Sequence, residues 1–347
     1  MRLFLSEFLC SGAVDPATAP ASLLREGRSM LLALAEDLAR LDGIEVCTTW
    51  HADLGDWPLP EVNALPVGSA NDEEVAFRRL ASECDATYVI APELDKLLLQ
   101  RCRMVEQTGG TSLNCTLEAI ALTGDKLRLW QHLQAAGIPS IPTASLNEAD
   151  PPEFPCVVKP RCGAGSENTY VAHDSTAYRQ VCNAVAGDEM IVQPYVAGTP
   201  CSIAAFFDDH SRLTVLLPPA AQHLSDDGRL KYRGGHAPLE TPQADALTDL
   251  VLSAAKSIGG LRGYVGFDLL LPYAAPQQPM LVEINPRLTT SYLGYRTLAR
   301  DNLAAWLLPQ SRTTNAPRWR HARVTFGPDG TIADSPAGTA MTSGTGP

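Results

Sequence analysis

The sequence predicts an α/β protein whose C-terminal part has mixed α+β structure. Near the N-terminus, apolar runs of strand length alternate with helical segments, which is typical of a parallel sheet with right-handed crossovers. Further along, two apolar runs at residues 201–207 and 212–217 flank a short polar turn, which favours antiparallel pairing. The length of 347 residues exceeds one average domain and suggests two or three.

An N-terminal α/β domain is expected at residues 1–123. Its strands are the apolar runs at residues 2–5, 44–49 and 86–91. Its helices are predicted from apolar spacing and capping signals at residues 23–41, 71–83 and 94–106. Loops rich in Gly, Pro or Ala are expected at residues 11–21 and 57–66. No Gly-x-Gly-x-x-Gly follows the first strand, so nothing marks this domain as dinucleotide-binding.

A small αβ module is expected at residues 124–198. An amphipathic helix begins near Lys126 and runs to Ala136, after a short helix at residues 117–122. Beyond a change in composition, strands are predicted at residues 156–160, 169–172 and 190–192. Asp174 is expected to cap a helix that runs to residue 185. The last strand leads into residues 193–198, which can act as a hinge to the next unit.

A C-terminal α+β module is expected at residues 199–326. After the two antiparallel strands, the sequence predicts a loop at residues 222–238 and a helix at 242–258. Two further strands are expected at 264–271 and 280–286. A polar loop at 288–294 and a short helix at 301–308 follow. The remaining residues, 327–347, are rich in Gly, Pro, Thr and Ser. We expect this tail to be poorly ordered.

Composition excludes several functional classes. The net charge of −12 argues against nucleic acid or an anionic membrane as partner, because both need a cationic face. No apolar run reaches the roughly 18 residues that cross a bilayer. The nine cysteines form no Cys-x-x-Cys pair and the seven histidines show no zinc spacing. We therefore expect a cytoplasmic protein with reduced thiols and small-molecule partners, for which a homodimer is compatible with the sequence.

Polar side chains gather on two neighbouring apolar strands. Alternation along residues 280–287 places Glu283, Asn285 and Arg287 on one face, and Asp268 lies in the preceding strand. Carboxylate and amide oxygens are ligands for Mg²⁺, and a guanidinium beside them suits phosphate. Incidental polar residues on exposed strand faces are the alternative. Four such residues together favour a metal–phosphate site.

Lys159 and the loop after it predict a phosphate contact. Lys159 ends an apolar strand, where an ammonium group is costly to bury unless it meets an anion. Gly163 and Gly165 let backbone N–H groups approach phosphate oxygens, although an ordinary turn is the alternative. Lys126, in the first turn of its helix, is unfavourable against the helix dipole. It is either a solvated surface residue or a second cation of this site.

Taken in order, these residues resemble the ATP-grasp ligase superfamily over roughly residues 1–310. The resemblance implies that ATP and Mg²⁺ (or Mn²⁺) bind between two αβ modules, behind an N-terminal Rossmann-like domain. It implies phosphate contacts from Lys126 and Lys159, with Lys159 and Arg287 acting in catalysis. It also implies a loop over the γ-phosphate, formed by Gly163, Ala164, Gly165 and Ser166. The implied adenine site consists of Gln193, Tyr195 and Val196. The implied metal site consists of Asp268, Glu283 and Asn285. The hinge often carries Glu, but the amide of Gln193 can also accept from the adenine amino group.

Two further stretches look like the tyramine–L-glutamate ligase branch, which serves methanofuran-type cofactor synthesis. They are Glu26-Gly27-Arg28-Ser29-Met30-Leu31 and Asn285-Pro286-Arg287-Leu288-Thr289-Thr290-Ser291-Tyr292. The branch implies a carboxylate–amine ligase that activates glutamate as an acyl phosphate and transfers it to tyramine or a tyrosine-like amine. No side-chain nucleophile is needed, and the sequence shows no nucleophile–base constellation. Substrate contacts are expected from Tyr232, Arg233, Gly234, Thr289, Thr290 and Ser291.

Alternatives remain open. Residues 289–292 can be a plain polar loop, and Arg233 can be a solvated surface residue. The protein can also ligate another amino acid or a dipeptide, bind nucleotide without ligation, or act as a kinase. Turnover with a panel of amines would reveal another ligase substrate. Stabilisation by ATP without phosphate release would indicate nucleotide binding alone. ADP formation without an amine would indicate a kinase.

Overall fold

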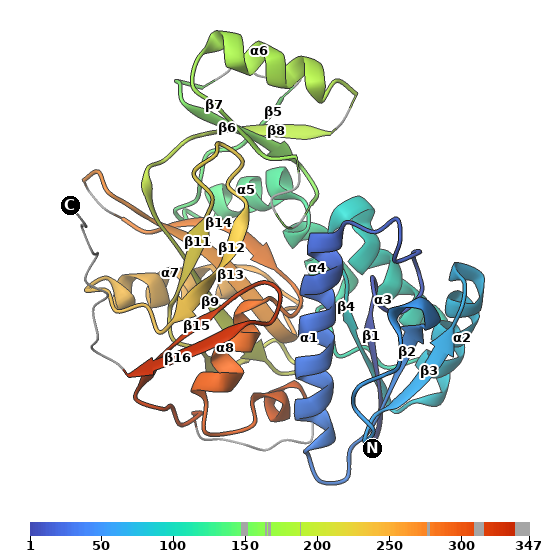
Figure 1. The fold of residues 1–347 in the computed structure, drawn as a ribbon. Helices are drawn as coiled ribbons and strands as arrows, with labels where there is room; N and C mark the ends of the chain where they lie inside the picture. The colour runs from blue at the N-terminus through green and yellow to red at the C-terminus, as the bar shows by residue number, and fades with distance from the viewer. Residues whose placement is uncertain are drawn as a thin grey trace, which may run out of the picture.

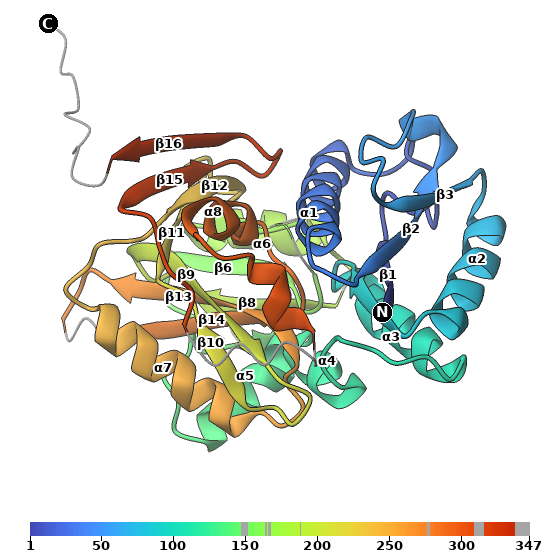
Figure 2. The same ribbon diagram turned by 90° about the horizontal axis from the view of Figure 1, so that it is seen from below.

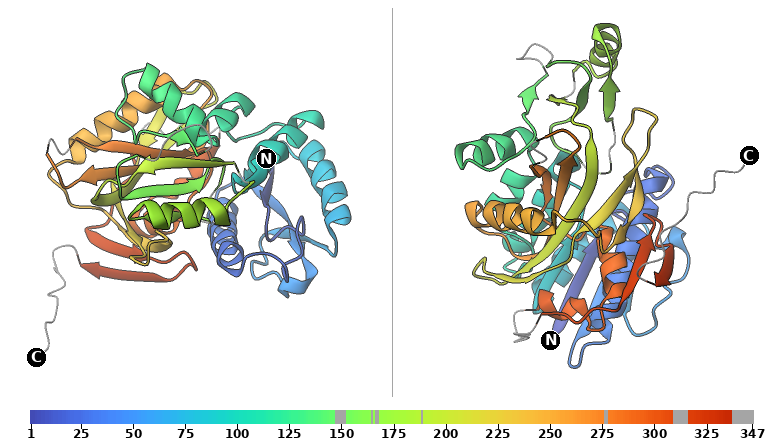
Figure 3. Two further views of the ribbon diagram at one scale, coloured as in Figure 1. Left: turned by 90° about the horizontal axis from the view of Figure 1, so that it is seen from above. Right: turned by 90° about the vertical axis from the view of Figure 1, so that its left-hand side faces the viewer.

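The computed structural model describes residues 1–146, 152–163, 165, 168–187, 189–275, 278–308 and 316–336. Its described strands form three sheets (Figure 1). The small module lies at one end of the molecule, over the C-terminal sheet, with the N-terminal domain to one side (Figures 1 and 3). The α/β prediction, with mixed structure in the C-terminal part, is confirmed.

The N-terminal sheet has the order β3-β2-β1-β4, and every pairing in it is parallel. Its strands are β1 (Arg2–Glu7), β2 (Glu45–His51), β3 (Asn63–Val67) and β4 (Ala86–Ile90). Helices α1 (Ala21–Ala39), α2 (Ala70–Glu83) and α3 (Leu97–Gln107) cover the sheet, with the short turns η1 (Ala52–Leu54) and η2 (Leu94–Lys96) between elements. In β1, Leu3 and Leu5 face the core under α1, while Phe4 packs against Phe77 of α2 with ring centroids 5.3 Å apart. This alternation places α1 on one face and α2 and α3 on the other (Figure 2).

The small module is an antiparallel sheet of order β5-β8-β6-β7 with one helix on it. Its elements are β5 (Ala144–Ser145), β6 (Cys156–Pro160), β7 (Tyr170–Ala172), α6 (Ser175–Ala184) and β8 (Met190–Pro194). As predicted, Asp174 caps α6, accepting from two backbone N–H groups at 2.8 and 2.9 Å. Helices α4 (Leu117–Thr123) and α5 (Lys126–Ala135) precede the module.

The C-terminal sheet has the order β14-β13-β9-β11-β12-β15-β16, with β10 beside β9, and all its pairings are antiparallel. Its strands are β9 (Gly198–Phe207), β10 (Leu213–Leu216), β11 (Ala220–Leu224), β12 (Tyr232–Ala237), β13 (Gly263–Pro272), β14 (Met280–Asn285), β15 (Ala322–Phe326) and β16 (Ile332–Pro336). Helices α7 (Ala244–Ser257) and α8 (Ser291–Leu298) and the 3₁₀ turn η3 (Leu303–Leu307) complete this part.

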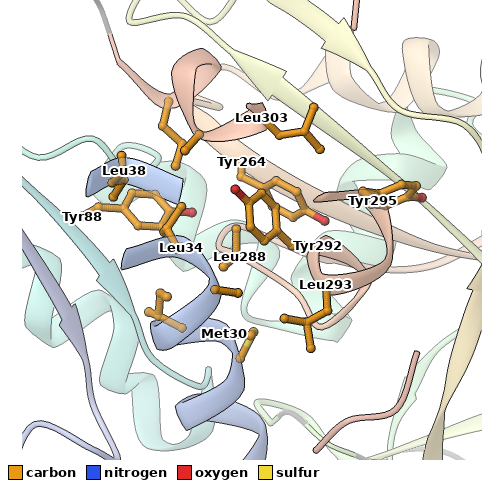
Figure 4. Packing of buried hydrophobic residues seen from close by; sticks show 14 of the residues in the cluster. Met30, Leu34, Leu38, Tyr88, Tyr264, Leu288, Tyr292, Leu293, Tyr295 and Leu303 are labelled. Carbon is orange, nitrogen blue, oxygen red and sulfur yellow. The ribbon is translucent and has the colours of Figure 1, made fainter. Parts of the chain in front are cut away.

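A shared core joins the N-terminal domain to the C-terminal part. Leu34 and Leu38 of α1 belong to the same buried cluster as Tyr264 and Tyr292, and Figure 4 shows them across this junction. The hydroxyl of Tyr292 donates to the carboxylate of Asp37 at 2.7 Å, which satisfies a buried polar group within the apolar contact. The two parts therefore pack as one body around α1.

Four predictions about segments are corrected. Residues 63–67 form the edge strand β3, where Pro66 is tolerated because it need not donate to a ladder. Residues 222–238 contain a β-hairpin made by β11 and β12, and the predicted polar loop ends at Ser291, where α8 begins. The expected disorder of residues 327–347 is wrong for 327–336, because β16 pairs with β15 along its whole length and the Gly327 N–H donates to the Thr331 carbonyl across the turn before it. Residues 337–347 lie outside the described part.

The cysteines and helices agree with the composition. All nine cysteines are free thiols, and seven of them are buried. Among the described residues, none of the helices has the length and apolar character that a bilayer crossing needs.

Candidate active site

Two carboxylates face each other across the strands β13 and β14. Asp268 and Glu283 are directly paired in the antiparallel register, and Asn285 lies two residues further on. The amide of Asn285 donates to one oxygen of Asp268 at 3.0 Å, and that of Gln222 donates to the other at 2.7 Å. Like charges directly opposite in a sheet are destabilising, so the pair needs a proton or a cation between its members.

The electrostatics of this pair follow from burial and from neighbouring charges. Burial and the negative charge of Glu283 raise the pKa of Asp268 to about 8. Burial opposes ionisation of Glu283 too, but the ammonium groups of Lys126 and Lys159 outweigh it and leave its pKa below the usual range. The described residues contain no group of three or more His, Cys, Asp and Glu side chains around one point. Two carboxylates and an amide oxygen fit a hard divalent cation such as Mg²⁺, which takes its other ligands from water and phosphate.

Two lysines lie beside the carboxylate pair. The Nζ of Lys126 is 3.5 Å from a carboxylate oxygen of Glu283 and donates to the carbonyl of Gly163 at 2.8 Å. Burial lowers the pKa of Lys159 to about 8, although Glu283 partly opposes this. In the part of the chain that the structure describes, Lys159 has no carboxylate within 4.0 Å. A buried cation without a close partner is suited to an anionic ligand.

The start of α5 is fixed to the small module, which explains how Lys126 reaches the site. Asp125 caps α5 and also accepts two hydrogen bonds from the guanidinium of Arg161, at 2.9 and 2.8 Å. The backbone N–H of Lys126 donates to the carbonyl of Arg161 at 3.0 Å. Lys126 therefore lies against the end of β6. The sequence alone left open whether this lysine is a solvated surface residue or part of the site.

A cavity of about 280 Å³ brings the predicted residues together. Among its lining residues are Lys126, Lys159, Gly163, Gly165, Gln193, Tyr195, Val196, Tyr232, Asp268, Glu283, Asn285, Arg287, Thr289, Thr290 and Ser291. Val157, which pairs with Gln193 in the sheet, also lines the cavity and gives this part of the wall an apolar surface that suits a nucleobase. Gln193 donates to the hydroxyl of Thr143 at 2.7 Å, which leaves its carbonyl oxygen as an acceptor. Ala164 and Ser166 lie outside the described residues.

Two predicted substrate residues are not in this cavity. Arg233 lines a neighbouring cavity. Gly234 lines neither of the two, and the structure gives it another role. Its φ is +107°, and a Cβ built there would be 2.2 Å from the carbonyl oxygen of Phe326. The glycine lets β12 approach β15 closely, so a substrate contact at Gly234 is not supported.

Arg287 is held by a residue that sequence reasoning missed. Its guanidinium donates to both carboxylate oxygens of Glu93, at 3.0 and 2.8 Å, and both side chains are buried. Glu93 follows β4, and Glu7 ends β1, where burial raises its pKa to about 7. Ligand residues often follow the carboxyl ends of parallel strands, which is the signal that could have pointed to both acids. Glu26, from α1, lines the cavity and accepts from the hydroxyl of Thr290.

The described fold is that of ATP-grasp enzymes. Residues 123–291 match the ATP-grasp domain family, and residues 44–120 match the pre ATP-grasp 3 domain family. The chain belongs to the ATP-grasp superfamily, and it is an ATP-grasp ligase of the ADP-forming carboxylate–amine class.

Particular relatives are distant. The chain is 24% identical over 301 residues to the tyramine–L-glutamate ligase of Methanocaldococcus fervens, covering 86% of this chain and 90% of the relative. It is 22% identical over 299 residues to the ligase of the same name from Methanocaldococcus jannaschii, covering 85% and 84%. Its fold is similar to an ATP-grasp superfamily protein from Archaeoglobus fulgidus, with a TM-score of 0.69, 21% identity and coverage of 94% and 92%. It is also similar to the L-amino acid ligase of Bacillus licheniformis, with a TM-score of 0.67, 15% identity and coverage of 93% and 78%.

Proposed function

We propose that this enzyme joins L-glutamate to tyramine or a tyrosine-like amine at the expense of ATP. The observation that carries the proposal is the single cavity in which Asp268 and Glu283 meet Lys126, Lys159 and Arg287. Its support on the substrate side is the alignment, over most of the chain, with two ligases named for tyramine and L-glutamate. A role in methanofuran-type cofactor synthesis is part of the same proposal.

In this proposal each part of the cavity has its own task. Lys126 and Lys159 bind ATP phosphates, and the loop from Gly163 to Ser166 covers the γ-phosphate. Gln193, Tyr195 and Val196 bind the adenine ring. Asp268, Glu283 and Asn285 hold Mg²⁺ (or Mn²⁺), which would neutralise charge on both sides of the phosphoryl transfer. Tyr232, Thr289, Thr290 and Ser291 contact the substrates.

The chemistry needs positioning and charge stabilisation. A γ-carboxylate oxygen of the acid attacks the γ-phosphorus in line, and ADP leaves. The amine then attacks the acyl carbon, and inorganic phosphate departs with that carboxylate oxygen. Arg287 stabilises the transferring phosphoryl group and the tetrahedral intermediate, and its pairing with Glu93 fixes it in place beforehand. Closure of the glycine loop keeps out the water that would hydrolyse the acyl phosphate.

The unit boundaries 1–123, 124–198 and 199–326 also belong to this proposal, in which ATP lies between the second and third units. A homodimer and a cytoplasmic location stay predictions from the sequence.

Phosphate release tests the proposal. The enzyme is supplied with ATP, Mg²⁺ and L-glutamate, with and without tyramine or tyrosine. We expect amine-dependent release and a γ-glutamyl amide by mass spectrometry. ADP formation that does not depend on the amine would indicate a kinase. No release, together with stabilisation by ATP, would refute the substrate assignment, and a wider panel of acids and amines would then be tried.

A further inference from the structure

A second cavity, of about 450 Å³, lies beside the first. Four segments form it, namely the start of α1, residues of the loop after β6, the β11–β12 hairpin and the turn between β15 and β16. It shares Glu26, Gly165 and Tyr232 with the first cavity, which is proposed to bind ATP. Gly165 belongs to the loop proposed to cover the γ-phosphate. A molecule in the second cavity can therefore extend a group to the place where phosphoryl transfer would occur.

The second cavity is cationic although the protein is acidic. Arg25, Arg229, Lys231 and Arg233 line it, against the two acids Glu26 and Asp329, in a chain of net charge −12. The described residues offer none of these four cations a carboxylate within 4.0 Å. Four cations thus face two carboxylates, and the cavity has a net positive charge that suits an anionic ligand.

Arg229 gives a second, independent indication of an anion. Its guanidinium carbon lies 4.1 Å from the centre of the Tyr170 ring, so the ring holds the guanidinium against one wall. Arg229 also lines the second cavity, so the ring fixes a cation at a wall that a ligand would meet.

We propose that this cationic cavity binds a carboxylate of the acid substrate other than the one that is activated. The enzyme then selects acids with two or more carboxylates, because one reacts at the junction of the cavities while another pairs with the arginines. Guanidinium groups suit this role, since they bind carboxylates through paired, charge-assisted hydrogen bonds. This inference rests on the proposed function and adds the class of acid to it.

The experiment compares two acids that differ by one carboxylate. L-Glutamate and 4-aminobutyrate share the chain that ends in the γ-carboxylate, but the second lacks the α-carboxylate. Wild type is compared with Arg233→Gln and Arg25→Gln, both at exposed positions, and with Arg103→Gln, an exposed residue of α3 that lines neither cavity. The control makes the same change of charge elsewhere.

We expect wild type to prefer L-glutamate by at least about tenfold in kcat/KM. Each cavity variant should raise KM for L-glutamate by about tenfold, the size of one lost charge-assisted hydrogen bond, with kcat and KM for ATP nearly unchanged. Turnover of 4-aminobutyrate and the control variant should not change. Equal losses for both acids would overturn the proposal. A raised KM for ATP alone would also overturn it, since the arginines would then serve the ATP phosphates.

A binding measurement separates this inference from the proposed function. If neither acid supports phosphate release, the proposed function fails, and glutarate and butyrate are titrated into the protein by calorimetry. Glutarate binding that exceeds butyrate binding and weakens at least about tenfold in the Arg25→Gln/Arg233→Gln double variant would support the cavity's role. Equal binding of the two acids, no glutarate binding, or full binding by the double variant would overturn it.

Discussion

Replacing Glu93 with glutamine tests how the proposed catalytic arginine is held. Arg287 and Glu93 form two hydrogen bonds, at 3.0 and 2.8 Å, between the end of β14 and the loop after β4. Arg287 is 9% exposed and Glu93 is 6% exposed. Glu93→Gln keeps the shape of the side chain but removes its charge. A buried guanidinium then loses its carboxylate partner.

The expected size of the effect follows from what remains around Arg287. Removing one partner of a buried ion pair commonly destabilises a protein by about 3–5 kcal/mol. Arg287 keeps a hydrogen bond to the carbonyl of Leu288 at 3.1 Å, and Glu26 and Glu283 still favour its charged form. We therefore expect the lower end, a loss of about 3 kcal/mol in the free energy of unfolding. Activity should fall mainly in kcat, because the proposed function assigns ATP binding to other residues.

Urea unfolding and steady-state kinetics measure both effects. A double-mutant cycle with Arg287→Met isolates the coupling, and the double variant should be more stable than the sum of the single losses predicts. Asp301→Asn is the matched control, because Asp301 also pairs with an arginine through two oxygens, but at the solvent-exposed Arg318, where water screens the charges. If Glu93→Gln unfolds at the same urea concentration as wild type, or the cycle shows additive losses, the pair does not hold Arg287 as described.

Three further predictions concern the proposed metal site, a buried acid and a glycine. Glu283→Gln should lower kcat by about 10²–10⁴-fold, because Glu283 is proposed to hold the charge-neutralising cation, while circular dichroism stays that of wild type; activity close to wild type would remove Glu283 from the site. Glu7 has a folded-state pKa of about 7 against an ordinary 4.5, so its contribution to stability is present below about pH 4.5 and is lost as pH rises to about 7. Glu7→Gln should remove this loss, worth about 3 kcal/mol, and a variant with the wild-type pH profile of unfolding would contradict the burial argument. Gly234→Ala should lower the free energy of unfolding by about 1–3 kcal/mol, because the added methyl group collides with the Phe326 carbonyl, and KM for either substrate should not change. The control is Gly228→Ala, which is also at positive φ but has open space around it and should lose less stability. A selective rise in substrate KM would return Gly234 to the site.

The local patterns of the sequence predicted the framework of the site. Alternation along 280–287 placed Glu283 and Asn285 on one face, and the neighbouring strand supplied Asp268 opposite Glu283. Lys159 could be placed because an ammonium group at the end of an apolar strand needs an anion. These inferences succeed because strand periodicity fixes which side chains share a face. The roles given to these residues still await the measurements above.

Other parts of the site depend on contacts between distant segments, which no local pattern reveals. Glu93 is 194 residues from Arg287 in sequence and meets it only because the N-terminal domain packs on the C-terminal part. The hairpin of β11 and β12 was hidden by glycines that resemble a loop, although Gly235 and Gly234 are there for close strand contacts. The composition of residues 327–336 suggested disorder, yet residues 332–336 pair with β15, and the turn before them lines the second cavity.

Transfer of a carboxylate oxygen to phosphate tests the central claim most directly. L-Glutamate labelled with ¹⁸O in its γ-carboxylate is incubated with the enzyme, ATP, Mg²⁺ and tyramine or tyrosine. If the acid is activated as an acyl phosphate, each inorganic phosphate released should carry one ¹⁸O atom from that carboxylate. Amide formation with unlabelled phosphate would contradict the account, because the acid would then be activated without a bond between its oxygen and the γ-phosphorus.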